Sequence, residues 1–243
     1  MRLTRVFVEG DLATGQRLTV EGSAGNHIVR VLRSRVGDEL TLFNGRGGEY
    51  GASIDEIRRD TVQVSVHSHR DQERESGFEL TLAQGISRGE RMDWVVQKAT
   101  ELGVTRIVPL FTERSVVHLD EKQASKKVQH WHGIAVAACE QCGRNVVPEI
   151  VDPVTLYGLL EASASSGISL LLSPTGSQRI ADLDGSPSGA TVLIGPEGGL
   201  AQVEQDAALR SGFTAVRMGP RVLRTETAAV CALTLLQQKF GDL

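Results

Sequence analysis

Apolar and polar positions follow two different rhythms along the chain, and the first covers residues 1–72. Short runs of alternating or β-branched residues are separated there by Gly and Asp, a pattern typical of strands joined by turns. One segment, 26–35 ("NHIVRVLRSR"), departs from it and predicts a helix. We therefore expect a small β-barrel or sandwich with one helix. The expected strands are residues 17–22, 38–45, 47–57 and 61–68.

The second rhythm begins after the charged segment 69–77 ("HRDQERESG"), where we place the domain boundary. Continuous apolar runs now alternate with helical apolar spacing, which predicts a mostly parallel sheet covered on both faces. The chain thus divides into an N-terminal β domain, 1–72, and an α/β domain, 76–243. The expected strands are 78–86, 106–111, 168–174, 190–195 and 213–219, and the expected helices are 89–104, 121–143, 155–164, 201–212 and 225–240.

Composition narrows the class of protein. A chain of 243 residues with 40% hydrophobic residues can bury a substantial core. It has no run of the roughly eighteen apolar residues that would span a membrane, and its first residues lack an apolar signal segment. We expect a soluble, cytoplasmic protein without membrane contact.

The formal net charge of −4 does not attract nucleic acid over the whole surface, so any RNA contact must be local. Arginines outnumber acidic residues between His27 and Arg46. Arg30 and Arg33 lie one turn apart in the expected helix. Their face either contacts RNA or is simply solvated, and spacing alone slightly favours the second interpretation.

Three cysteines, Cys139, Cys142 and Cys231, do not form a disulfide framework and fit a reducing compartment. The pair in "CEQC" has two interpretations: a metal or redox site with His130 and His132, or a helix end with small apolar side chains. The two histidines point to nearly opposite sides of a helix, and no second pair of cysteines exists. We favour the helix end and expect no metal.

Three loops that follow expected strands carry unusual sequences: "SPTG" (173–176), "GPEGG" (195–199) and "GPRVLRTET" (219–227). Ligands gather at the carboxyl ends of strands in such sheets. Glycines at Gly195, Gly198 and Gly199 permit positive φ and a close approach of the backbone to a ligand. Together the loops predict a ligand site.

Glu197 indicates which ligand. The loop matches neither phosphate-binding glycine motif, and a carboxylate repels phosphate. It can instead accept hydrogen bonds from hydroxyl groups or pair with a cation, while Ile194, Met218 and Leu223 offer apolar contact to a flat ring. S-adenosylmethionine has this profile, with its uncharged adenosine, ribose hydroxyls and cationic methyl donor.

Five segments in order along the chain resemble the RsmE family of 16S ribosomal RNA uridine N3-methyltransferases, of the SPOUT class. They are "HIVRVLRSRVGDELTLFNGRGGEY", "ISRGERMDWVVQKATELGV", "ACEQCGRN", "LIGPEGGL" and "MGPRVLRTETAA". The resemblance implies a PUA-like β-barrel followed by a SPOUT-type parallel sheet with a C-terminal trefoil knot. It also implies a homodimer that binds S-adenosylmethionine and methylates N3 of a uridine in the small ribosomal subunit.

The resemblance further implies which residues contact the cofactor. They lie in the three glycine-containing loops and at the start of the last helix. They are Leu172, Ser173, Ile194, Gly195, Glu197, Gly199, Met218, Gly219, Leu223, Arg224, Thr225 and Ala228.

Methylation at N3 requires removal of a proton and stabilisation of the uracil anion. An arginine can stabilise the anion, and a carboxylate or water can accept the proton. The candidates are Arg144, Asn145, Arg224 and Glu226, with Glu140 as a further base. For Glu226 a structural role is as well supported as a catalytic one: an acid in the first turn of a helix is stabilised by the helix dipole.

RNA phosphates have further candidate partners in Arg88, Arg91 and Arg114, besides Arg30 and Arg33. Two other functions stay open at this point: an RNA-binding or ribosome-assembly protein without catalysis, and a SPOUT methyltransferase that acts on ribose 2′-hydroxyls. The intact glycine loops argue against the first.

Overall fold

The computed structural model describes residues 4–115, 117, 119–162 and 167–243. They form two compact units. The first consists of Met1–Glu75 and Val136–Val147, and the second of Ser76–Ala135 and Pro148–Leu243. Residues 136–147, which the sequence pattern assigned to the α/β domain, therefore pack in the first unit.

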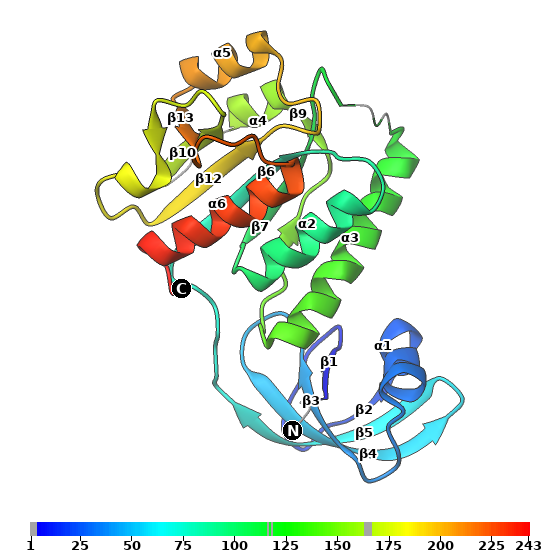
Figure 1. The fold of residues 1–243 in the computed structure, drawn as a ribbon. Helices are drawn as coiled ribbons and strands as arrows, with labels where there is room; N and C mark the ends of the chain where they lie inside the picture. The colour runs from blue at the N-terminus through cyan, green and yellow to red at the C-terminus, as the bar shows by residue number, and fades with distance from the viewer. Residues whose placement is uncertain (1–3, 116, 118, 163–166) are drawn as a thin grey trace. The chain divides into compact units, whose positions relative to one another are not determined.

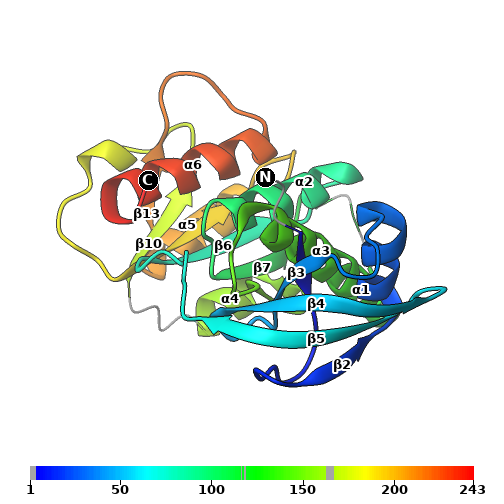
Figure 2. The ribbon, with the colours of Figure 1, turned by 90° about the horizontal axis from the view of Figure 1, so that it is seen from below.

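A five-stranded sheet in the order β1-β3-β4-β5-β2 forms most of the first unit (Figures 1 and 2). Each of the four expected strands is present, but the short β1, which pairs in parallel with β3, was not expected. The remaining pairs are antiparallel. The strands are β1 (Arg5–Phe7), β2 (Arg17–Val20), β3 (Glu39–Phe43), β4 (Glu49–Arg58) and β5 (Thr61–Arg70).

The core of this unit follows from the alternation along the strands. Inward residues such as Leu42, Ile54 and Val64 are buried in one hydrophobic cluster. Register shifts between Gly51 and Ala52 and between Ile54 and Glu56 interrupt the β4–β5 pairing. Such bulges bend and twist a long hairpin.

The expected helix at 26–35 is displaced toward the N-terminus: it begins four residues earlier and ends three residues earlier. An α-helical turn, α1 (Gly22–Asn26), continues as a π-helical turn, His27–Leu32, and Arg33 ends it in the left-handed conformation with φ 56°. Ile28 anchors the turn in the core. Arg30 therefore lies on the helical turn, whereas Arg33 lies beyond its end.

The second unit contains a parallel sheet in the order β11-β13-β10-β12-β6-β7-β8, with β9 also pairing with β7. All five expected strands are present. The short strands β8, β9 and β11 were not expected. The strands are β6 (Glu79–Gly85), β7 (Arg106–Phe111), β8 (Glu149–Ile150), β9 (Val154–Thr155), β10 (Ile168–Leu172), β11 (Gln178–Arg179), β12 (Gly189–Ile194) and β13 (Thr214–Arg217).

Helices cover both faces of this sheet, as the continuous apolar runs predicted. Helices α2 and α6 pack together on one face, and α4 and α5 share a hydrophobic cluster with the other (Figure 1). The last two residues of the helix expected at 155–164 lie outside the described residues. No helix in the described ranges is long and apolar enough to cross a bilayer. The helices are α2 (Glu90–Glu101), α3 (Glu121–Cys142), α4 (Leu156–Ala162), α5 (Gln202–Arg210), α6 (Thr225–Phe240) and a 3₁₀ turn at Ile180–Asp182.

Candidate active site

A cavity of about 550 Å³ lies at the carboxyl ends of β10, β12 and β13, inside the second unit. These strands are neighbours in a parallel sheet, so the loops that follow them meet at one edge. Every residue that the resemblance assigned to the cofactor lines this cavity. The lining also includes Arg91, Arg114, Leu171, Pro174, Pro196, Gly198, Leu200, Gln205, Val216, Arg221, Val222 and Glu226.

Two glycines shape the loop after β12 in different ways. Gly199 has a φ of +68°, in the left-handed region that glycine adopts most easily. Gly195 does not, but a Cβ there would lie 2.7 Å from the carbonyl carbon of Gly199. One glycine is thus required by backbone conformation and the other by close packing within the loop.

Glu197 is held by the start of α2. Its Oε1 accepts hydrogen bonds from the Arg91 guanidinium at 2.6 Å and from the backbone N–H of Arg88 at 3.0 Å. Burial acts to raise the pKa of Glu197, but the hydrogen bonds from its own N–H, from Arg88 and from Arg91 outweigh it and hold the pKa below its usual value. The carboxylate therefore anchors the glycine loop as well as lining the cavity.

Arginines gather around the cavity. Arg114 donates to the carbonyl oxygen of Gly198 at 3.1 Å, and Arg221 and Arg224 are exposed on the loop before α6. Between them Val222 is 79% exposed. Arg221 and Val222 were not predicted as site residues from the sequence, although both lie inside the "GPRVLRTET" segment. Two arginines predicted to contact RNA, Arg91 and Arg114, thus lie beside the predicted cofactor contacts.

Glu226 lies in the first turn of α6 and lines the cavity. Its Oε2 is buried and has no hydrogen-bond partner among the described atoms. Its place in the first turn fits the interpretation as a helix N-terminal acid, and its role as a catalytic base stays a prediction. An unpaired buried oxygen is costly, which favours an external donor for it.

Arg144 and Asn145 lie in the first unit and do not line the cavity. Both are buried. The Arg144 guanidinium donates twice to Glu75 Oε2, at 2.6 and 2.9 Å. Asn145 Oδ1 accepts from Arg5 at 2.6 Å, and Arg5 also pairs with Glu49 at 2.6 Å.

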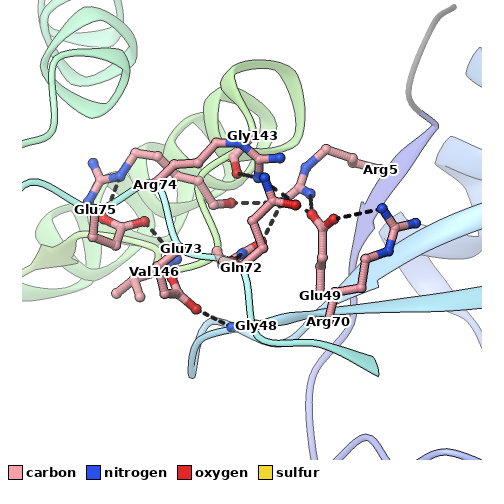
Figure 3. Close-up of polar contacts among 12 residues, drawn as sticks. Arg5, Gly48, Glu49, Arg70, Gln72, Glu73, Arg74, Glu75, Gly143 and Val146 are labelled. Carbon is pink, nitrogen blue, oxygen red and sulfur yellow. Dashed lines mark hydrogen bonds and ion pairs between the residues drawn. The ribbon is translucent and has the colours of Figure 1, made fainter. Parts of the chain in front are cut away.

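The charged segment before the second unit extends this polar cluster to the surface (Figure 3). Glu75 Oε1 accepts from the backbone N–H of Val146 at 3.2 Å, and Arg74 donates to the carbonyl oxygen of Gly143 at 2.9 Å. Asn145 donates to the carbonyl oxygen of Gln72. Three residues of the stretch that the sequence marked as a boundary, Gln72, Arg74 and Glu75, are therefore bound to residues 143–146.

Glu140, the further candidate base, also lies in the first unit. Its Oε1 accepts from the N–H of Phe7 at 3.0 Å, and His27 Nε2 lies 3.7 Å from its Oε2. Burial raises the pKa of this carboxyl, against the lowering effect of Phe7, His27 and Arg5. Glu140 does not line the cavity.

The "CEQC" pair ends α3. Cys139 is buried, its Sγ donates to the carbonyl oxygen of Val146 at 3.6 Å, and burial raises its pKa to about 12. A thiol in that state is a poor nucleophile at neutral pH. Within the described residues, no three His, Cys, Asp or Glu side chains are arranged to hold a metal ion.

Known families match both parts of the chain. The RNA methyltransferase domain family matches residues 74–237. The RNA methyltransferase PUA domain family matches residues 20–66. The five-stranded sheet and the parallel sheet are therefore a PUA-like domain and an RNA methyltransferase domain.

Whole proteins match over the full length. Ribosomal RNA small subunit methyltransferase E of Buchnera aphidicola (Schizaphis graminum) is 34% identical, over 100% of this chain and 98% of its own. The Bacillus subtilis enzyme of that name is 31% identical, over 96% of both chains.

Two solved methyltransferase structures resemble the whole chain. A putative methyltransferase from Legionella pneumophila in complex with SAM matches with a TM-score of 0.97 and 42% identity, over 100% of both chains. Ribosomal RNA small subunit methyltransferase E from Neisseria gonorrhoeae bound to S-adenosyl methionine matches with a TM-score of 0.92 and 34% identity, over 99% of both. The chain therefore belongs to the ribosomal RNA small subunit methyltransferase E (RsmE) family of RNA methyltransferases.

Proposed function

We propose that this protein uses S-adenosylmethionine to methylate N3 of a uridine in 16S ribosomal RNA. One observation carries the proposal: the residues that the resemblance assigned to the cofactor come from three separate loops and line one cavity. Two structural relatives of at least 34% identity hold the same cofactor.

The cavity suits this cofactor in size and chemistry. Its volume of about 550 Å³ lies within the range of small-molecule sites. Leu172, Met218 and Leu223 supply apolar contact for the adenine ring, and the carboxylates of Glu197 and Glu226 supply acceptors for hydroxyl or ammonium groups. When bound, S-adenosylmethionine supplies an electrophilic methyl group.

The chain's own residues supply the remaining requirements. Arg224 lines the cavity and can stabilise the negative charge on the uracil carbonyl oxygens once N3 loses its proton. Glu226 lines the cavity, and its carboxylate can take this proton, directly or through a water molecule. Arg144, Asn145 and Glu140 remain candidates, although their described partners lie within the first unit.

RNA contact is assigned to arginines in both units. Arg91 and Arg114 line the cavity, Arg88 adjoins it, and Arg30 and Arg33 are exposed on the PUA-like domain. Since the net charge is −4, these local clusters must provide the attraction to phosphate. The target base must be unstacked to enter a cavity of this kind.

Homodimer formation, the trefoil knot and a cytoplasmic location remain part of the proposal. The knot and the dimer rest on the resemblance. The small ribosomal subunit as substrate rests on the names of the relatives, which act on RNA of that subunit by name.

The test is to incubate small-subunit ribosomal RNA with the protein and methyl-deuterated S-adenosylmethionine and to analyse the nucleosides by mass spectrometry. We expect deuterated 3-methyluridine, with a much lower yield from Glu226→Gln. A deuterated methyl group on a ribose 2′-oxygen would show that the protein is a ribose methyltransferase instead. Cofactor binding in calorimetry without label on any RNA would contradict the proposed substrate.

A further inference from the structure

Gln84 is a fully buried polar side chain in a strand whose other buried side chains are apolar. It is 0% exposed and lies near the end of β6, in register with Ile194 on β12 and Pro109 on β7. It is not one of the described residues that line the cavity. Its neighbours are.

The Gln84 amide belongs to a short hydrogen-bond relay. Nε2 lies 2.9 Å from Thr225 Oγ1, and Thr225 Oγ1 lies 2.7 Å from the carbonyl oxygen of Gly195. The carbonyl can only accept, so the hydroxyl donates to it and accepts from the amide. The relay therefore joins β6, the first residue of α6 and the loop after β12.

Two further contacts fix the amide orientation. Nε2 donates to the carbonyl oxygen of Gly85 at 3.0 Å, and the carbonyl oxygen of Gly195 is 3.4 Å away. Both neighbours are acceptors, so the amide nitrogen and not the oxygen must face them. The backbone at Gly85 lies directly under the loop, since a Cβ there would be 2.5 Å from Pro196 Cδ.

Stability does not explain a glutamine at this position. Gln84 Oε1 is buried and has no hydrogen-bond partner among the described atoms. An unpaired buried amide oxygen is unfavourable, whereas an apolar side chain of similar shape would carry no such penalty. What explains the amide is its nitrogen, which donates hydrogen bonds to Thr225 Oγ1 and to the carbonyl oxygen of Gly195. Both residues line the cavity.

We propose that Gln84 is a positioning residue for the methyl-donor cavity: it sets the Thr225 hydroxyl and the Gly195 carbonyl in the arrangement that the cofactor requires. It acts through these two residues and does not touch the cofactor. The inference rests on the proposed function, because it takes the cavity to hold S-adenosylmethionine.

The chain offers a matched control in Gln237. This glutamine is also buried, at 1% exposure, and lies near the other end of α6. Its Nε2 donates to the carbonyl oxygen of Leu102 at 3.0 Å, and its Oε1 accepts from Ser76 at 2.8 Å. Gln237 does not line the cavity.

The experiment compares Gln84→Met with Gln237→Met by titration calorimetry with S-adenosylmethionine, thermal unfolding and steady-state kinetics. We expect Gln84→Met to unfold close to the parent temperature but to weaken the cofactor Kd about tenfold, because Thr225 and Gly195 lose the partner that sets their positions in the cavity. Its kcat at saturating cofactor should change far less than its KM for the cofactor. Gln237→Met should lower the unfolding temperature and leave Kd unchanged.

A double-mutant cycle identifies the relay. Thr225→Val removes the hydroxyl, so adding Gln84→Met to it should weaken binding by less than about twofold more. An unchanged Kd in Gln84→Met, equal weakening by both glutamine variants, or full additivity with Thr225→Val would each overturn the inference. If Gln84→Met fails to fold, parent-like affinity in Thr225→Val overturns it instead. A parent protein that binds no S-adenosylmethionine would overturn the proposed function first, and this inference with it.

Discussion

The Arg91 guanidinium donates a hydrogen bond of 2.6 Å to Glu197 Oε1, which ties the first turn of α2 to the glycine loop after β12. A residue predicted to contact RNA and a residue predicted to contact the cofactor are thus direct partners. A change at either one should therefore affect both ligands.

Glu197→Gln should lower the free energy of unfolding at pH 7 by no more than about 1 kcal/mol, because the pair is partly exposed. The pKa of Glu197 lies below the ordinary 4.5, so its stabilising contribution is present above that pH and is lost as the pH falls through the folded-state pKa. Urea titrations of parent and variant should therefore converge below pH 4.5.

Glu101→Gln is the control, since Glu101 pairs with Lys98 on the same helix and does not line the cavity. It should leave the affinity for S-adenosylmethionine unchanged, whereas Glu197→Gln should weaken it. Equal affinities in the two variants would remove Glu197 from the binding site.

Gly199→Val should weaken S-adenosylmethionine binding at least tenfold, about 1.4 kcal/mol or more, because a β-branched residue is strained at φ +68° and the loop must shift. Gly212→Val is matched to it: Gly212 has φ +90°, open space around it and no place in the lining. Calorimetry should show weakened binding only for Gly199→Val, although both variants lose stability. Parent-like affinity in Gly199→Val would mean that the cofactor does not depend on this loop.

Replacing Arg30 and Arg33 together by Ala should reduce the salt dependence of RNA binding by up to about two in log–log slope, roughly one for each lost phosphate contact. Both side chains are exposed, and neither forms an ion pair within the described residues. Filter binding across a salt series measures the slope. Arg58→Ala is the control, because Arg58 is already paired with Glu56. An unchanged slope in the double variant would make the π-helical turn an ordinary solvated face.

Arg144→Lys should lower kcat on the order of a hundredfold if this arginine stabilises the uracil anion. The buried pair with Glu75 offers a competing explanation through stability. Glu75→Gln separates the two, since it removes the ion pair but leaves the guanidinium. If Glu75→Gln loses as much activity as Arg144→Lys, the arginine acts by holding the first unit together. Dimer mass, measured alongside, tests whether subunit dissociation causes the loss.

Periodicity predicted most of this fold because its strands and helices are long enough for a pattern to repeat. The parallel sheet, the helices on both of its faces and the hairpin strands all follow from apolar spacing. The strands β1, β8, β9 and β11 did not, because two or three residues carry no period. The trefoil knot stays a prediction, since chain threading leaves no trace in local pattern.

The candidate site was predictable where glycine loops mark it, and less so where distant side chains complete it. "GPEGG" and "GPRVLRTET" pointed to the cavity, but nothing local indicates that Arg91 meets Glu197 or that Arg5 meets Asn145. Such pairs depend on contacts between residues far apart in the chain. Gln84 did leave one signal, a lone amide inside the run "LTLAQGI", which a search for polar residues in apolar strands would find.

The first unit is assembled from two separate stretches of the chain, and this affects how it could be moved between proteins. A gene fusion that took only residues up to Glu75 would leave behind Val136–Val147. Arg5 would then lose Asn145, and Glu75 would lose Arg144. A single crossover after Glu75 therefore cannot transplant the unit intact, and a functional transplant must carry the end of α3 with it.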